Sequence, residues 1–178
     1  MSLADNVHMM TNKELNGLAQ NRFIDNKTQV KLANHYYRLC REYLAMNPNL
    51  CTEARDILWD RRGYVLKTML MSAGHYANEP EKYHELYETL KNNKNVSPWR
   101  VQTAFVYNYW HRQPGPSYTP SSIIEDIAIN NPFGFVGYTL DTLARHPNLT
   151  RRAACYLTTV DFPRVSKTAF ERLATDLA

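Results

Sequence analysis

The stretch Leu44-Ala45-Met46-Asn47-Pro48-Asn49-Leu50 returns later in the chain as Leu143-Ala144-Arg145-His146-Pro147-Asn148-Leu149. In each copy a proline follows the apolar pair, and proline disfavours a helical conformation for the residue before it. Each copy therefore predicts the end of one helix, a tight turn and the start of the next helix. We expect the whole chain to be built from such helix pairs.

The similarity between the two copies continues into the following helix. Matching residues stand at the same offsets, namely Leu44, Ala45, Asn47, Leu50, Ala54 and Leu58 in the first copy and Leu143, Ala144, His146, Leu149, Ala153 and Leu157 in the second. A weaker third copy starts at Leu18, with Ala19, Asn21, Ile24 and Leu32. One helix pair cannot bury its apolar face alone, so such pairs stack on one another. Any helical bundle with Asn-Pro turns could also produce two such echoes.

This pattern resembles the HEAT-like helical repeats, in particular a leucine-rich variant written roughly L-A-x-N-P-x-L, about ten variable residues, then V-R-x-x-L-A. The resemblance covers Leu44 to Leu70 and Leu143 to Leu173 and is poor between Met71 and Pro132. It implies a curved stack of antiparallel helix pairs with a concave face. Members of this class are mostly binding scaffolds, some bind nucleic acid, and one group are alkylpurine DNA glycosylases; in that last case Trp59 and Asp60 would be the aromatic and the acid of a site.

Start and stop signals elsewhere also predict helices. Thr11 and Glu14 form a capping-box pattern before a short helix that ends near Gln20. Further helices are expected over 27–46, from Thr52 to Gly63, over 64–76, after Pro80, Pro98 and Pro120, over 133–145 and 150–159, and from Pro163 to about Asp176. We predict an all-α fold of stacked antiparallel helix pairs, about nine or ten helices in a single domain of residues 1–178.

Composition supports a folded, soluble protein. The 178 residues suit one domain, and a hydrophobic fraction of 44% with 12 tyrosines argues against disorder. The formal net charge of +4 is ordinary for solubility. Three cysteines without a C-x-x-C pair disfavour a zinc site or a disulfide framework and favour a reducing compartment. No apolar run is long enough for a membrane span, so we expect a cytoplasmic protein with no membrane partner.

Signatures of common enzymes are missing from the sequence. It contains no phosphate-binding glycine loop, no dinucleotide fingerprint, no H-E-x-x-H and no G-x-S-x-G. The six histidines include no pair at the spacing that would place two on one helix face. We therefore expect no enzyme activity, no cofactor and no bound metal.

Basic residues gather in two parts of the chain. Arg55, Arg61, Arg62 and Lys67 form one group, and Arg145, Arg151, Arg152, Arg164 and Lys167 form the other. If the repeats stack, the two groups would make one basic ridge that could meet phosphates or an acidic protein surface. The alternative is a solvated face with local ion pairs.

Aromatic residues are dense in the segment from Trp99 to Trp110. Successive positions cannot all face inward on one helix, so some of Tyr107, Trp110 and Arg112 should lie outside the core. An exposed group of Tyr, Trp and Arg is typical of a binding hot spot and would also suit base stacking. The alternative is that these side chains fill the seam to neighbouring helices.

Three functional hypotheses follow from these features. The first is a non-enzymatic adaptor or inhibitor that binds another protein through Tyr107, Trp110, Arg112, Arg61 and Arg62. The second is nucleic-acid binding, with a glycosylase-like activity as one form of it, through Arg55, Lys67, Arg145, Arg151, Arg152, Arg164 and Lys167. The third is a homodimer formed by the outer side of the last helix, which carries Val165, Ala169, Leu173 and Leu177.

Overall fold

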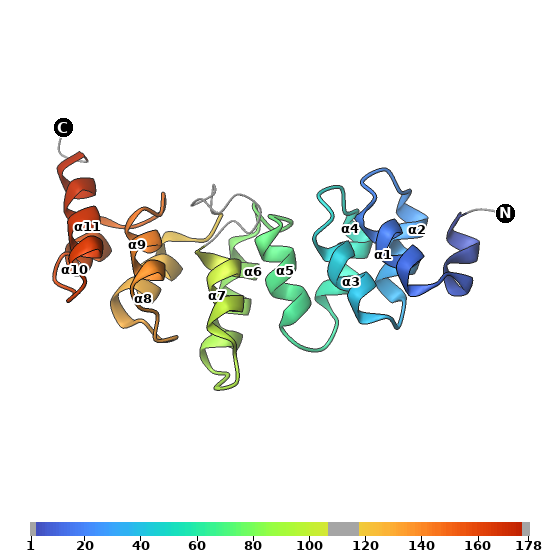
Figure 1. The fold of residues 1–178 in the computed structure, drawn as a ribbon, viewed down its shortest axis with the longest axis horizontal. Helices are drawn as coiled ribbons and strands as arrows, with labels where there is room; N and C mark the ends of the chain where they lie inside the picture. Colours follow the sequence, from blue (N-terminus) through green and yellow to red (C-terminus); the bar gives the residue numbers. More distant parts are fainter. Residues whose placement is uncertain (1–2, 107–117, 176–178) are drawn as a thin grey trace. The chain divides into compact units, whose positions relative to one another are not determined.

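The computed structural model describes residues 3–106 and 118–175, and within these ranges every regular element is a helix (Figure 1). The all-α prediction is therefore confirmed. The elements are η1 (Leu3–Met9), α1 (Asn12–Gln20), α2 (Asn26–Asn34), α3 (Arg38–Ala45), α4 (Thr52–Trp59), α5 (Val65–Ser72), α6 (Pro80–Lys91), α7 (Pro98–Phe105), α8 (Ser121–Asn130), α9 (Tyr138–Ala144), α10 (Arg151–Leu157) and α11 (Pro163–Thr175). None of these helices is both long and apolar enough to cross a membrane.

The chain contacts divide into two compact units, residues 1–75 and residues 76–178. We call them the N-terminal unit and the C-terminal unit and describe each by itself. The expectation of a single domain stays a prediction.

Helices of the N-terminal unit pack in two layers. α3 lies between α1 and α5 in one layer, and α2 packs against α4 in the other (Figure 1). The core between the layers contains fully buried leucines and small residues, including Leu32, Cys40, Leu44, Ala54 and Leu58. Each helix buries one face and relies on its neighbours to cover it, which is the packing expected of stacked helix pairs.

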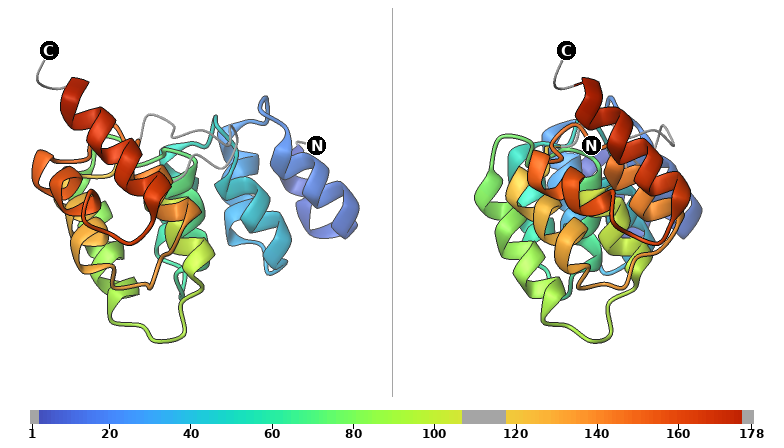
Figure 2. Two further views of the ribbon diagram at one scale, coloured as in Figure 1. Left: turned by 60° about the vertical axis from the view of Figure 1, so that its left-hand side comes forward. Right: turned by 90° about the vertical axis from the view of Figure 1, so that its left-hand side faces the viewer.

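The C-terminal unit repeats this pattern with a more aromatic core. α9 packs against α11, α8 packs against α10, and α11 also covers α10, as Figure 2 shows for the red and orange helices. Tyr87 meets Phe105 edge-on at 5.6 Å and Phe133 at 5.9 Å between ring centroids. These edge-to-face contacts join three segments that are distant in sequence.

The same turn closes five of the described helices. Its key residue is an Asn or His whose N–H donates to the carbonyl of a leucine three residues earlier. The side chain of this residue accepts the N–H two residues later, at 3.0–3.1 Å. The five residues are Asn21, His35, Asn47, Asn93 and His146, after Leu18, Leu32, Leu44, Leu90 and Leu143. The predicted turns at Asn47 and His146 thus have matching hydrogen bonds, and two further copies were not predicted.

The predicted helix ends near Gly63 and at 76 fall at Trp59 and Ser72 in the structure, and two larger differences concern α2, α3 and α9. The helix expected over 27–46 is two helices, because His35 closes α2 and its Nδ1 accepts the Tyr37 N–H, turning the chain before α3. α9 begins at Tyr138 and not at Phe133, because Gly134 and Gly137 adopt φ angles of 65° and 49° that a right-handed helix does not allow. The capping box of Thr11 and Glu14 is confirmed.

Candidate interaction surface

An exposed apolar row runs along α3. Tyr36 precedes the helix and is 82% exposed, Leu39 is 45% exposed, and Tyr43 is 40% exposed. The four-residue spacing of Leu39 and Tyr43 places these two side chains on one side of α3, whose opposite side buries Cys40 and Leu44, and Tyr36 lies in the turn just before the helix. Since α1 and α5 flank this helix, the row is the outward side of a helix that is otherwise packed. We call these three residues the α3 row.

Tyr36 is supported at the start of the row by His35. The two rings lie 4.4 Å apart between centroids. Nδ1 of His35 accepts the Tyr37 N–H, so the imidazole is held in place. Burial, followed by the nearby charge of Arg41, lowers the pKa of His35, which favours the neutral form of its ring. The exposed Tyr36 ring therefore rests on a fixed, uncharged partner.

Three arginines surround the same end of α3. Arg41 donates to the His35 carbonyl, and Nη2 of Arg61 donates to the Ala33 carbonyl at 3.2 Å, so both cap the C-terminal end of α2. A cation is favoured there by the helix dipole. Arg38 forms an ion pair with Glu42, and its own side chain is 68% exposed. We call Arg38, Arg41 and Arg61 the arginine cluster.

Positive charge is in excess in this cluster. Burial, followed by the charge of Arg61, lowers the pKa of Arg41. Nε of Arg41 is buried and donates no hydrogen bond, although a buried charged donor is costly to leave unpaired. Among the described residues, Glu42 is the carboxylate that pairs with the cluster, against three guanidinium groups.

The residues predicted as a partner site have different positions. Tyr107, Trp110 and Arg112 lie outside the described residues. Arg61 belongs to the arginine cluster, where it has a structural role, and its neighbour Arg62 is exposed. The α3 row was missed because the sequence was interpreted as one helix over 27–46. The signal that could have found it is Leu32-Ala33-Asn34-His35, which matches the Leu-Ala pair and turn residue of the other copies.

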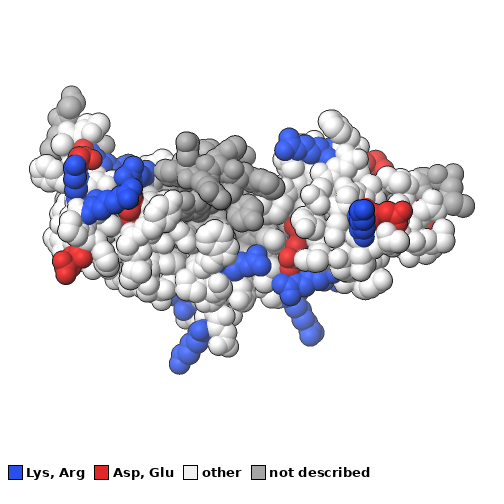
Figure 3. Space-filling view, viewed as in Figure 1, with Lys and Arg blue, Asp and Glu red and all other residues white. Residues whose placement is uncertain are grey.

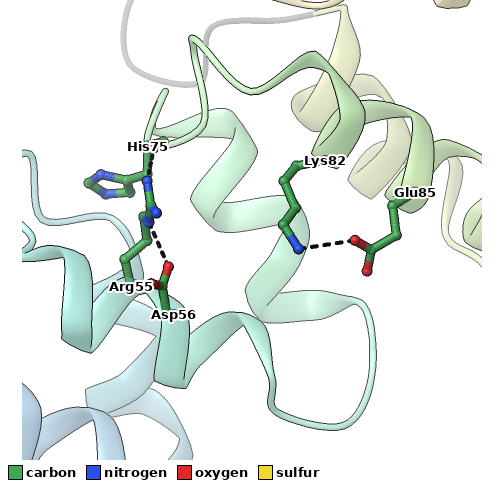
Figure 4. A network of polar contacts seen from close by, with 5 residues as sticks. All are labelled: Arg55, Asp56, His75, Lys82 and Glu85. Atoms are coloured by element: carbon green, nitrogen blue, oxygen red, sulfur yellow. Dashed lines mark hydrogen bonds and ion pairs between the residues drawn. The ribbon is translucent and has the colours of Figure 1, made fainter.

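Two of the basic residues predicted for nucleic-acid binding in the N-terminal unit, Arg55 and Lys67, are engaged within the fold. Arg55 lies between the Asp56 carboxylate, at 2.9 Å, and the His75 carbonyl, at 3.2 Å, as Figure 4 shows. Lys67 sits over the Trp59 ring, 4.9 Å from its centroid. Both side chains therefore contribute to packing, which makes them poor candidates for a free phosphate-binding edge.

Acidic side chains also accompany the basic group of the C-terminal unit. Arg145 and Arg164 both pair with the buried carboxylate of Asp141, at 3.5 and 3.2 Å. Arg152 pairs with Glu125, and Lys167 pairs with Glu171. Figure 3 shows basic and acidic side chains adjoining one another over these C-terminal helices. Arg151 is exposed. A ridge that joins the two basic groups stays a prediction, since the groups belong to separate units.

Further expectations concern a glycosylase-like pair, a dimer face and a metal site. Trp59 is only 3% exposed and belongs to the core, while Asp60 is the exposed C-cap of α4, so they do not line a common site. Val165 and Ala169 are buried where α11 packs on α9 and α10, so the prediction that they face outward was wrong. Leu173 is half-buried, Leu177 lies outside the described residues, and the homodimer itself stays a prediction. In residues 3–106 and 118–175 no group of His, Cys, Asp or Glu is arranged to hold a metal ion.

Comparison with known proteins gives no match. No protein-family model matches the chain, and searches of curated proteins and of solved structures find no significant relative. The resemblance to HEAT-like repeats therefore stays a prediction, and functional inference depends on the surface itself.

Proposed function

We propose that this chain is a non-enzymatic helical-array protein, an adaptor or inhibitor, that binds another protein through the α3 row. The observation that supports it most directly is the exposure of Leu39 and Tyr43 on one side of a helix that buries Cys40 and Leu44 on the other, with the exposed Tyr36 in the turn before it. Large apolar side chains that stay exposed together on a packed helix are typical of interaction sites. Tyrosine next to arginine is also the composition of binding hot spots.

Rigidity of the support favours this function. α3 is packed between α1 and α5, and the His35 ring holds the first tyrosine in place. A partner would therefore bury aromatic surface without first having to order the helix, which lowers the entropic cost of binding.

Nucleic-acid binding is less well supported. Four of the basic residues predicted for it pair with Asp141, Glu125 or Glu171, which reduces the charge available to phosphates. Leu39, in the middle of the α3 row, offers no ring for base stacking. We expect no binding of mixed-sequence DNA or RNA. Binding that weakens steeply with added salt would instead support nucleic-acid recognition by the predicted basic ridge.

Photo-crosslinking followed by a binding measurement tests the proposal. A benzophenone amino acid at Leu39 should yield a discrete adduct in the source cells, and the captured protein is then purified. Tyr36→Ala/Tyr43→Ala should weaken its binding about tenfold or more, because two anchors are lost. Phe23→Ala is the matched control, since Phe23 is 92% exposed in the α1–α2 turn and outside the row. No adduct, or equal losses in both variants, would refute the proposal.

A further inference from the structure

The arginine cluster lies at one end of the α3 row, and this asymmetry carries information about the partner. Arg41 and Arg61 converge on the carbonyl end of α2, beside Tyr36, while Leu39 and Tyr43 continue along α3. The surface is thus positively charged at the α2–α3 turn and apolar beyond it. A ligand that matches it must have the same order of features, with negative charge at one end.

Hydrogen-bonding capacity at the charged end is not exhausted. Arg38, Arg41 and Arg61 together offer many N–H groups, and the fold uses one bond to each of two carbonyls and an ion pair with Glu42. Nε of Arg41 remains buried without an acceptor. Guanidinium groups bind carboxylates through two parallel hydrogen bonds, so an incoming carboxylate could pair with the Arg38 side chain, which is 68% exposed.

The geometry points to a ligand that is an acidic amphipathic segment of a partner protein, about two helical turns long, with a carboxylate at the arginine cluster and apolar side chains on the α3 row. This inference rests on the proposed function. The helical part of the row, from Leu39 to Tyr43, covers about one turn of α3, and the exposed Tyr36 before it extends the row. An amphipathic helix of about two turns, roughly 11 Å long, would present apolar anchors three or four positions apart to this row.

Selection of 12-residue peptides displayed on phage tests the inference on the purified full chain. We expect the enriched sequences to combine an acidic end with apolar residues three or four positions apart. Tyr36→Ala/Tyr43→Ala should abolish the enrichment. Arg38→Glu should remove the acidic preference and retain the apolar one, whereas Arg22→Glu, the same charge change at an exposed residue of the α1–α2 turn, should retain both.

Arg41→Gln is a second test variant, and its peptide affinity is measured together with side-chain resonances of the wild type. An enriched peptide should bind it about tenfold more weakly, and in the wild type the peptide should shift the Arg38 and Arg41 side-chain resonances. Enrichment without acidic preference, or a preference unchanged by Arg38→Glu, would overturn this inference and leave the proposed function standing. Absence of any tyrosine-dependent enrichment would overturn the proposed function. Binding of a single-stranded DNA oligonucleotide that Arg38→Glu weakens would assign the cluster to phosphates and overturn the acidic-segment inference.

Discussion

The turns at Asn47 and His146 have matching backbone hydrogen bonds, but the two side chains differ in the further bonds that they form. Each residue donates its N–H to a leucine carbonyl, and each side chain accepts the N–H two residues later. Nδ2 of Asn47 also donates to the carbonyls of Ala19, at 2.9 Å, and Asn21, at 3.0 Å, where α1 ends and the α1–α2 turn begins. Nε2 of His146, in contrast, is buried without a partner.

This difference separates two roles that one side chain can have in such a turn. Accepting the N–H two residues later shapes the turn, and both Asn and His can do it. A side chain that donates to an earlier turn joins two neighbouring hairpins. Asn47 does so through the α1–α2 turn, whereas His146 does not. In the C-terminal unit Arg172 binds the turn from the other side, donating to the carbonyls of His146 and Pro147 at 2.7 and 3.1 Å.

Asn47→Ala should have the largest effect in this comparison. The side chain is 2% exposed, and its loss leaves the carbonyls of Ala19 and Asn21 and the N–H of Asn49 without their partner. We expect the N-terminal unit to lose about 4 kcal/mol of unfolding free energy, measured by hydrogen exchange of core amides. Asn49→Ala, which removes one exposed bond to the Arg22 carbonyl, should cost about 1 kcal/mol. Equal costs would contradict the joining role of Asn47.

Acid should weaken the His146 turn. Burial, followed by the charge of Arg172, lowers the pKa of His146 to about 4. Because the unfolded value is near 6.5, the contribution of the neutral imidazole is complete above about pH 6.5 and is lost as the pH falls toward 4. We expect the C-terminal unit to lose about 3 kcal/mol more than a His146→Asn variant over this range. Urea unfolding at pH 7 and pH 4 measures it, and parallel losses in both proteins would contradict the assignment.

Arg172→Gln should have a smaller effect, and this effect should be larger at neutral pH than in acid. Loss of the two charged hydrogen bonds should cost about 2 kcal/mol at pH 7. Removing the positive charge should raise the pKa of His146 and thereby reduce the acid sensitivity of the turn. Arg152→Gln is the control, because that side chain is 78% exposed in its pair with Glu125 and should cost less than about 0.5 kcal/mol. A similar cost for both arginines would remove Arg172 from the comparison.

The sequence correctly predicted those caps and turns whose hydrogen bonds join residues close together in the chain. The capping box at Thr11 and the turns after Leu44 and Leu143 involve groups only a few positions apart, so their residue types are sufficient. The division between α2 and α3 was missed because apolar residues such as Ala33, Tyr37 and Cys40 keep a helical spacing across the turn.

Long-range partners explain most of the rest. The hydrogen bonds from Asn47 to Ala19 and Asn21 span 28 and 26 residues, and no periodic pattern in the sequence predicts them. Likewise, the spacing of Val165 and Ala169 reveals an apolar face of the last helix, but only the packing shows that α9 and α10 cover it. The candidate surface on α3 could not be predicted before the helix boundary at His35 was known.

Closure of a turn by the hairpin that follows it has a consequence for synthesis of the chain. The carbonyls of Ala19 and Asn21 can accept from the Asn47 amide only after Asn47, 26 residues after Asn21, has emerged from the ribosome. The His146 carbonyl likewise accepts from Arg172, which is synthesised 26 residues later. These two turns should therefore reach their final hydrogen bonding only after the following hairpin has been synthesised.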